Sequence, residues 1–250
     1  MRERGFSLIE MLVVVAVFTV ITGAAFLMLN VSQQRYKMES ELLDSFQSAR
    51  IGLDQMMRDI HTSGYPPLQS LPAAVAAANP TMGAFPFAWE PSYPNTPCAV
   101  PNCTLPDGYD MIVESDLDRE NGNGVEWIRY RLNGTTLERG VVTKTAGADP
   151  DAATQAVLFP YVENVMNDAS DDRKKLIQAS HPAMFPGGAS VPIFAYLCGT
   201  PPVPCTAADT ILDVREVSVT LIVAAPNLDP RTRQVRVVAL TGLARRINPS

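Results

Sequence analysis

The sequence predicts an α+β fold in which one long N-terminal helix packs on a head of antiparallel β-sheet. Three observations support this prediction: an apolar run near the N-terminus, a helical stripe that follows it, and alternating strand patterns in the second half of the chain. The helix should span a membrane in its first half and be amphipathic in its second half. The expected order is a leader at 1–5, a membrane-spanning helix at 6–30, its amphipathic continuation at 31–64 and a globular head at 65–250.

The composition is that of a folded chain with an acidic balance. Of 250 residues, 46% are hydrophobic and 18% are charged, which excludes a disordered or collagen-like chain. Acidic residues outnumber basic residues by 26 to 20, and the net charge is −6. Because a nucleic-acid interface normally needs a basic surface, no nucleic-acid partner is expected.

The apolar run is long enough to cross a membrane. Between Phe6 and Leu29 only Glu10 is charged. A helix of this length measures roughly 36 Å at about 1.5 Å per residue, and a bilayer core is about 30 Å thick. Arg2 and Arg4 make the leader basic, which predicts a cytoplasmic N-terminus and an exported head. A cleaved secretory signal and a plain signal anchor are the alternatives, and neither accounts for a carboxylate inside the run.

A specific motif lies at the start of this run. A short basic leader ends in Gly and is followed by Phe, a small residue, two aliphatic residues and Glu, as Gly5-Phe6-Ser7-Leu8-Ile9-Glu10. This pattern resembles the signature of the type IV prepilin and pseudopilin superfamily. The resemblance implies that a prepilin peptidase cleaves between Gly5 and Phe6 and N-methylates Phe6, and that Glu10 acts in filament assembly.

The spacing of the motif has a physical reason. Cleavage would give Phe6 a free amine, and Glu10 lies four residues further, one helical turn on and on the same face. In a filament the carboxylate can meet the terminal amine of a neighbouring subunit. Two charges that are each costly in hydrocarbon are tolerated there as a pair. The implied partners are other major and minor pilins, which bind through the N-terminal helix.

Helical periodicity continues beyond the apolar run. Apolar residues recur at spacings of three and four, which places Leu42, Phe46, Ala49, Leu53, Met57 and Ile60 on one face. The sequence Gly64-Tyr65-Pro66-Pro67 is a strong stop signal. The helix is therefore predicted from Phe6 to about Thr62. A break near 30–34, followed by a separate core helix, is the alternative.

The head should begin with a long loop and continue in strands. Residues 66–106 contain many prolines, which predicts an ordered loop in place of helix or central strand. Asn133-Gly134 is a hairpin signal. The predicted strands are Met111–Glu114, Glu126–Leu132, Thr136–Lys144, Val157–Val165, Ile193–Leu197, Asp213–Val223 and Arg233–Gly242.

Three head segments carry a narrower resemblance. They are the helix exit Arg58-Asp59-Ile60, the segment Ile128–Leu132 leading to Leu137-Glu138-Arg139, and Phe194-Ala195-Tyr196 before two long strands. They resemble the larger minor pilins and pseudopilins of the PilW and GspJ type. This resemblance implies a low-copy subunit that primes filament assembly and lies at or near the tip.

Four cysteines form two local pairs. In an exported head an even number of cysteines indicates disulfides. Three pairings are possible, and the favoured one joins Cys98 to Cys103 and Cys198 to Cys205. A zinc site made of all four cysteines is the alternative, and it would need closer spacing and a reducing compartment.

One acidic segment has the residue types of a calcium loop. Asp116, Asp118, Asn121 and Glu126 are the possible ligands. The segment departs from the EF-hand pattern because its Gly falls one position late and Arg119 adds a cation. An acidic solvated turn is the other interpretation, and no cofactor apart from this possible Ca²⁺ is expected.

The sequence contains no catalytic motif, so the protein is not expected to be an enzyme. His61 and His181 are interpreted as structural residues, and the charge run over 168–175 as a solvated helix face. The resulting hypothesis is a minor pilin of a type IV pilus. The alternatives are a minor pseudopilin of a type II secretion system, a tip adhesin module and an anchored periplasmic enzyme.

The hypothesis also implies a location and further partners. The precursor would cross the bacterial inner membrane once, with the head in the periplasm. After assembly it would lie in a pilus at the cell surface. Besides other pilins, it would meet the prepilin peptidase and the inner-membrane assembly platform.

Overall fold

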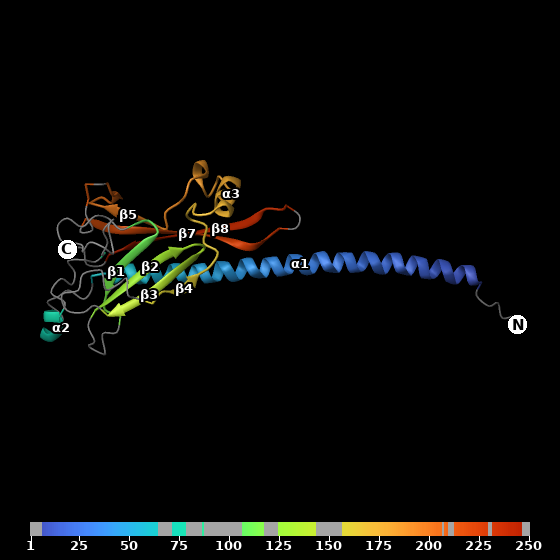
Figure 1. Ribbon diagram of the computed structural model, residues 1–250, viewed down its shortest axis with the longest axis horizontal. Helices are drawn as coiled ribbons and strands as arrows, with labels where there is room; N and C mark the ends of the chain where they lie inside the picture. Colours follow the sequence, from blue (N-terminus) through green and yellow to red (C-terminus); the bar gives the residue numbers. More distant parts are fainter. Residues whose placement is uncertain are drawn as a thin grey trace.

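The computed structural model describes residues 7–64, 72–78, 87, 107–117, 125–143, 157–206, 208–209, 213–229 and 232–246. A long helix, α1, projects from a head that contains two antiparallel β-sheets (Figure 1). This α+β arrangement confirms the predicted fold class. One half of α1 lies against the head, and the other half extends away from it.

Helix α1 (Leu8–His61) runs for 54 residues without interruption. The alternative of a break near 30–34 is therefore wrong, since that segment is helical. The helix ends at Thr62, whose N–H donates to the carbonyl of Arg58 at 3.0 Å. Gly64 follows with φ of 72°, a conformation that glycine adopts without steric cost. The predicted helix end at about Thr62 is confirmed.

The first sheet, sheet A, contains four antiparallel strands in the order β1-β2-β3-β4. The β2–β3 hairpin pairs Asn133 with Thr136, and Gly134 in its turn has φ of 56°. The bounds are β1 (Asp110–Ser115), β2 (Glu126–Asn133), β3 (Thr136–Thr143) and β4 (Phe159–Val162).

The second sheet, sheet B, has the order β6-β5-β7-β8 and is also antiparallel. Strand β7 continues to Leu228, five residues beyond its predicted end, and β6 was not predicted. The bounds are β5 (Phe194–Cys198), β6 (Val203–Pro204), β7 (Val214–Leu228) and β8 (Val235–Arg245).

The segment Val157–Val165 is predicted as one strand, but the structure divides it between the two sheets. β4 covers only Phe159–Val162 and pairs with β3 in sheet A. Val165 instead forms an isolated bridge with Val223 of β7. Between them Asn164 has φ of 59°, which ends the extended conformation and explains why the strand is short.

Two short helices complete the described head. α2 (Ala73–Ala78) lies within the proline-rich segment that was predicted as loop. The loop prediction is therefore wrong for these six residues, because they are alanine and valine with no proline among them, and alanine favours helix. α3 (Asp172–Ser180) begins at Asp171, whose carboxylate accepts from the Lys174 N–H at 2.8 Å. A 3₁₀ turn, η3, covers Pro186–Gly188.

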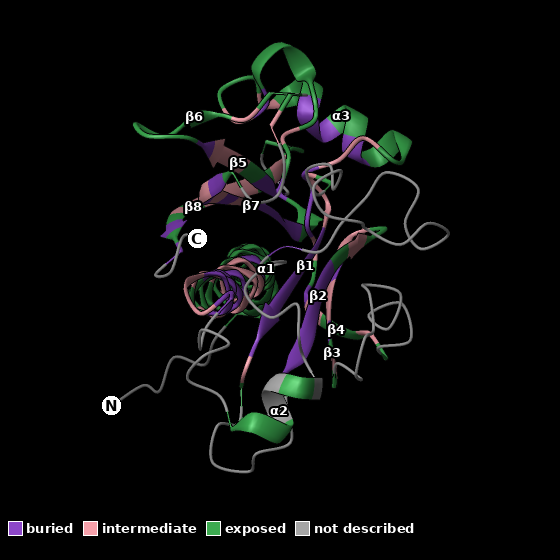
Figure 2. Ribbon diagram, turned by 90° about the vertical axis from the view of Figure 1, so that its left-hand side faces the viewer, coloured by how far each residue is buried: buried purple, intermediate pink, exposed green. Residues whose placement is uncertain are grey.

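The core lies where α1 meets both sheets. Figure 2 views α1 nearly end-on, with β7 and β8 on one side and β1 and β2 on another. Ala49, Leu53 and Ile60 of the predicted stripe are buried, and Met56 is buried as well. The facing core residues include Met111, Val113, Ile128, Tyr130, Leu137, Val162, Phe194, Val217, Val219 and Leu221.

Candidate functional site: the exposed half of α1 and its anchorage to the head

The start of α1 is fixed by a capping box. Ser7 is the N-cap, and its hydroxyl accepts from the Ile9 N–H at 3.4 Å. The carboxylate of Glu10 in turn accepts from the Ser7 N–H at 2.9 Å. Such reciprocal bonds satisfy amides that the first helical turn leaves without partners. Glu10 therefore lies at the electropositive end of the helix, with its carboxylate held by the backbone.

The part of α1 from Met11 to Leu29 is exposed and apolar on all faces. From Leu8 to Lys37 every side chain is exposed except that of Thr22, which is half-buried. A window of 18 residues has a mean hydropathy of 2.7, and none of it is buried. By length and composition this helix can cross a membrane. The Thr19 hydroxyl donates to the Val15 carbonyl at 2.8 Å, so this polar group is satisfied within the helix.

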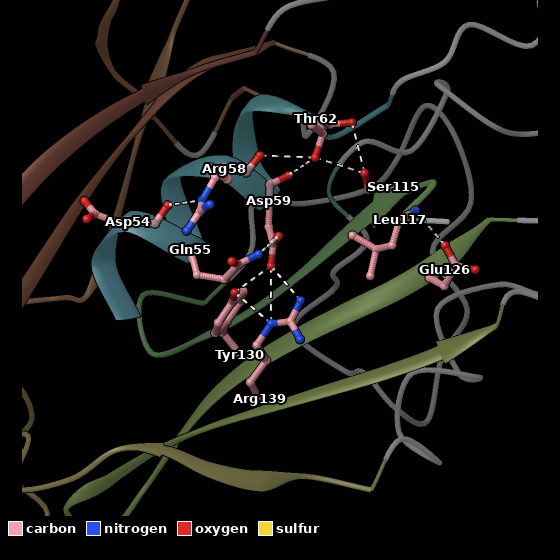
Figure 3. A network of polar contacts seen from close by, with 10 residues as sticks. All are labelled: Asp54, Gln55, Arg58, Asp59, Thr62, Ser115, Leu117, Glu126, Tyr130 and Arg139. Carbon is pink, nitrogen blue, oxygen red and sulfur yellow. Dashed lines mark hydrogen bonds and ion pairs between the residues drawn. The ribbon is translucent and has the colours of Figure 1, made fainter. Parts of the chain in front are cut away.

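The other half of α1 is fixed to the head by one buried carboxylate. The Asp59 side chain is 3% exposed. Its Oδ2 accepts from the Tyr130 hydroxyl at 2.6 Å and from Nη2 of Arg139 at 2.9 Å (Figure 3). Its Oδ1 accepts from Nε2 of Gln55 at 2.7 Å. The carboxylate thus joins α1 to β2 and β3 of sheet A. We call Gln55, Asp59, Tyr130 and Arg139 the Asp59 cluster.

The same cluster shifts the acidity of the tyrosine. Burial raises the pKa of Tyr130 far above its usual value, and the negative charge of Asp59 raises the pKa further. Tyr130 is fully buried, so it remains a neutral donor to Asp59. Sequence reasoning missed this cluster. The signal that was available is an aspartate at position 59, on the buried side of a helix next to Met56 and Ile60.

A second contact ties the helix exit to sheet A. The hydroxyl of Ser115, at the end of β1, donates to Oγ1 of Thr62 at 3.0 Å (Figure 3). The N–H of Gly64 donates to the carbonyl of Glu114 at 2.8 Å. With the Asp59 cluster, these bonds fix the direction in which α1 leaves the head.

The candidate processing residues cannot be placed, because Gly5 and Phe6 lie outside the described residues. Glu10 is described and lies in the first turn of α1. Cys98 and Cys103 also lie outside the described residues. Cys198 and Cys205 form a disulfide, which is one of the two expected pairs and excludes the four-cysteine zinc site.

The possible calcium loop is described only in part. Asp118 and Asn121 lie outside the described residues. Oε2 of Glu126 accepts from the Leu117 N–H at 2.9 Å, so this carboxylate binds the backbone of its own loop (Figure 3). Over the described part of the chain, no group of three or more His, Cys, Asp or Glu side chains is placed to hold a metal ion.

The interpretation of the charge run over 168–175 as a solvated helix face is wrong for one residue. α3 does form there, but Lys174 is fully buried. Its ammonium group donates to the Gly134 carbonyl at 2.5 Å and pairs with the carboxylate of Asp168. The lysine therefore fixes α3 to the β2–β3 turn, which the charge pattern alone does not reveal.

Both histidines contact backbone carbonyls. Nδ1 of His61 lies 2.5 Å from the Arg245 carbonyl, and Nδ1 of His181 lies 3.0 Å from the Ile177 carbonyl. These contacts are those of structural residues.

Comparison with known proteins gives one match. Residues 1–26 match the family described as "Prokaryotic N-terminal methylation motif". This match supports the resemblance to the type IV prepilin superfamily and covers a short part of the 250-residue chain. No curated protein and no solved structure matches the chain. The matched residues include Ser7, Glu10 and the first part of the exposed apolar helix.

Proposed function

We propose that this chain is a membrane-anchored prepilin whose mature form is a minor subunit of a type IV pilus. The observation that carries the proposal is that three features occur together in one segment. The methylation motif covers the start of a helix that is apolar on all faces and exposed, with Glu10 in its first turn. A helix of this kind needs an apolar surrounding, and a bilayer followed by a bundle of neighbouring helices supplies it.

Processing follows from the motif. A prepilin peptidase cleaves between Gly5 and Phe6 and methylates the new amine of Phe6. Glu10 then lies one turn from that amine. In the filament the Glu10 carboxylate pairs with the Phe6 amine of a neighbouring subunit, since each charge alone is costly in an apolar bundle. The capping bond from Ser7 supports this step because it already directs the carboxylate to the end of the helix.

The topology and partners follow in turn. The basic leader keeps the N-terminus in the cytoplasm, and the head is exported to the periplasm. An exported head explains the Cys198–Cys205 disulfide, and we expect Cys98 and Cys103 to form the second one. The partners are other pilins, the prepilin peptidase and the assembly platform. The role in priming or at the tip rests on the resemblance of the three head segments.

The proposal is tested first at the cleavage site. Gly5→Ala should block removal of the leader, because the peptidase reads the residue before the cut. Mass spectrometry of the protein from cell membranes would then find a precursor that retains Met1–Gly5. The unmodified chain should begin at N-methylated Phe6. A Gly5→Ala protein that matures normally, or an unmodified chain that begins elsewhere, would contradict the proposal.

A second variant in the same strain tests the assembly step. Glu10→Val removes the costly charge, so the protein should still insert in the membrane and lose its leader, but it should not enter filaments. The measurement is the amount of subunit in sheared pili relative to membranes. A Glu10→Val protein found in pili at the normal level would overturn the pairing. If the unmodified subunit is found in the periplasm and never in sheared pili, the result would favour the secretion pseudopilus.

A further inference from the structure

Strand β8 forms one edge of sheet B, and the direction of its backbone groups can be deduced. The Arg246 N–H donates to the Arg215 carbonyl at 3.1 Å. In an antiparallel ladder hydrogen-bonded pairs alternate with pairs that are not hydrogen-bonded. Along the continuous register from Glu216↔Arg245 to Ala224↔Val237, every second residue of β8 therefore points its N–H and C=O away from β7. We call these residues, Val237, Ala239, Thr241 and Leu243, the β8 edge.

The partners of β7 support this assignment. Thr220 and Ile222, which face Thr241 and Ala239, turn their backbone groups away from β8. The Thr220 N–H donates to the Ile193 carbonyl at 2.8 Å. The Ile222 N–H donates to Oδ1 of Asn167 at 2.9 Å. The free side of β7 is thus filled by other parts of the head.

The β8 edge has no such cover among the described residues. Within them β8 pairs only with β7. One contact lies at its end, where the His61 imidazole binds the Arg245 carbonyl at 2.5 Å. Ala239, Thr241 and Leu243 are exposed. Up to Leu243, therefore, no described group prevents another strand from adding.

The edge also lacks the usual protection against strand addition. Natural edge strands carry a lysine, a proline or a bulge. Between Arg236 and Arg245 the sequence contains no charged residue and no proline. The one register irregularity of the β7–β8 pair lies between Ala224 and Leu228, before this stretch. Eight consecutive residues, 237–244, thus form a regular and uncharged edge.

The orientation of β8 restricts what can pair with it. Near its start, Arg236 shares a surface pocket with Arg35 and Met38 of α1. Near its end, Gly242 packs against Met57, and Arg245 meets His61. β8 therefore runs beside α1 in the same direction, as Figure 1 also shows. The edge therefore lies along the helix, and β8 runs away from the exposed apolar half of α1.

This orientation excludes the simplest self-pairing. Antiparallel pairing of β8 with the β8 of a second copy needs a two-fold axis across the strands. That axis would also reverse α1, so the two apolar helices would point in opposite directions. Two chains anchored in one membrane with their heads on the same side cannot adopt this arrangement.

We propose that the β8 edge binds, by strand addition, an extended uncharged segment of a different subunit anchored in the same membrane. The segment runs antiparallel to β8, back towards the membrane, since every strand pair of the described head is antiparallel. Only an extended backbone presents donors and acceptors at the two-residue repeat of the edge. This inference rests on the proposed function, because assembly brings such heads side by side.

The first experiment places a photo-cross-linking amino acid at Leu243 of the full chain, in cells that assemble the filament. Leu243 is 52% exposed and belongs to the edge. The expected product joins this chain to another membrane-anchored subunit. The matched control is the same group at Val203 of β6, which is 55% exposed and lies at the opposite edge of sheet B, and which should give no such product. No product at Leu243, or a product with a second copy alone, would overturn the proposal.

The second experiment tests the backbone directly. Ala239→Pro removes an N–H that points away from β7, so the β7–β8 ladder keeps its bonds. Ala239→Val is the matched control, because it retains that N–H. The cross-link at Leu243 should fall at least about fivefold with proline, the factor for one net hydrogen bond, and should persist with valine. Equal yields from the two variants would refute strand addition.

Two further readouts keep the outcomes separate. Thermal unfolding shows whether the Ala239→Pro variant is folded. If it is not folded, the cross-link at Leu243 in the chain that retains Ala239 decides whether strand addition occurs. Mass spectrometry of the same samples reports whether the chain begins at Phe6. Normal cleavage with no cross-link refutes strand addition alone, whereas absence of cleavage refutes the proposed function.

Discussion

The two halves of α1 belong to one uninterrupted helix, yet they are built for different surroundings. From Met11 to Leu29 apolar side chains cover all faces, and the helix is exposed as far as Lys37 with the exception of the half-buried Thr22. From Met38 onward most apolar side chains lie on one face, and Ala49, Leu53, Met56 and Ile60 are buried in the head, while Leu43 and Ile51 are exposed. Periodicity thus indicates a partner within the chain, and its absence in an apolar helix indicates an apolar medium outside the chain.

The polar groups of the two halves differ in the same way. Glu10 and Thr19 bond to the backbone of their own helix. Asp59 instead bonds to side chains of β2 and β3. The exposed apolar half keeps its polar groups satisfied within its own helix, whereas the half with a partner in the head directs a carboxylate to that partner. Three substitutions, each with a control substitution, test this contrast.

The largest effect is expected for Asp59→Ala. It leaves the buried Tyr130 hydroxyl and the Arg139 guanidinium without their common acceptor, and loss of one member of a buried ion pair costs about 3–5 kcal/mol. The free energy of unfolding, measured by urea titration of the full chain in detergent micelles, should fall by about 3 kcal/mol or more.

Asp54→Ala is the control for this substitution. Asp54 lies in the same helix but is exposed, so its substitution should change the free energy of unfolding by less than about 0.5 kcal/mol. If both variants unfold alike, the Asp59 cluster does not fix α1 to the head.

A smaller effect distinguishes two glycines of α1. A Cβ at Gly52 would lie 2.5 Å from Cγ2 of Val162, whereas a Cβ at Gly23 would have no atom within 4 Å. Overpacking costs about 1–3 kcal/mol, and alanine returns about 1 kcal/mol of helix propensity. Gly52→Ala should therefore destabilise the head by about 1 kcal/mol, and Gly23→Ala should leave its unfolding unchanged. A Gly23→Ala variant with the larger effect would mean that the exposed half packs against the head.

The periodic signals in the sequence predicted most of the fold. The 3–4 spacing and the stop signal at Gly64–Pro67 predicted the C-terminal end of α1, and the strand patterns located β1, β2, β3, β5, β7 and β8 to within five residues at each end. These signals are local, so they do not determine how strands divide between sheets. Val157–Val165 has a single strand pattern, yet Asn164 turns the chain from sheet A to sheet B.

The polar contacts of the head were not predictable in the same way. Asp59 and Lys174 have charged side chains that sequence patterns assign to solvent, and each is buried because a partner distant in sequence receives it. Glu10 could be identified because its motif is contiguous. The candidate site was thus readable where its residues are neighbours in sequence, and the anchorage was not, because it depends on tertiary contacts.

The last expected effect appears only at alkaline pH. Burial, and then the charge of Asp59, raise the pKa of Tyr130 in the folded head above its usual value of 10.0. The unfolded chain therefore releases this proton first. The stability that Tyr130 contributes is complete below pH 10 and is lost as the pH rises further, by at most about 1.4 kcal/mol per pH unit.

Tyr130→Phe should reduce this slope by the contribution of one tyrosine, because burial also raises the pKa values of Tyr161 and Tyr196. It should also lower stability at neutral pH, because the bond to Asp59 is lost. Urea titrations between pH 9 and pH 11 measure the slope. Tyr36→Phe is the control, since Tyr36 lies in the exposed half of α1 with 77% of its surface accessible and meets solvent whether the head is folded or not. A slope that is as steep in Tyr130→Phe as in the unmodified chain, or that falls as much in Tyr36→Phe, would show that Tyr130 does not contribute to the alkaline response.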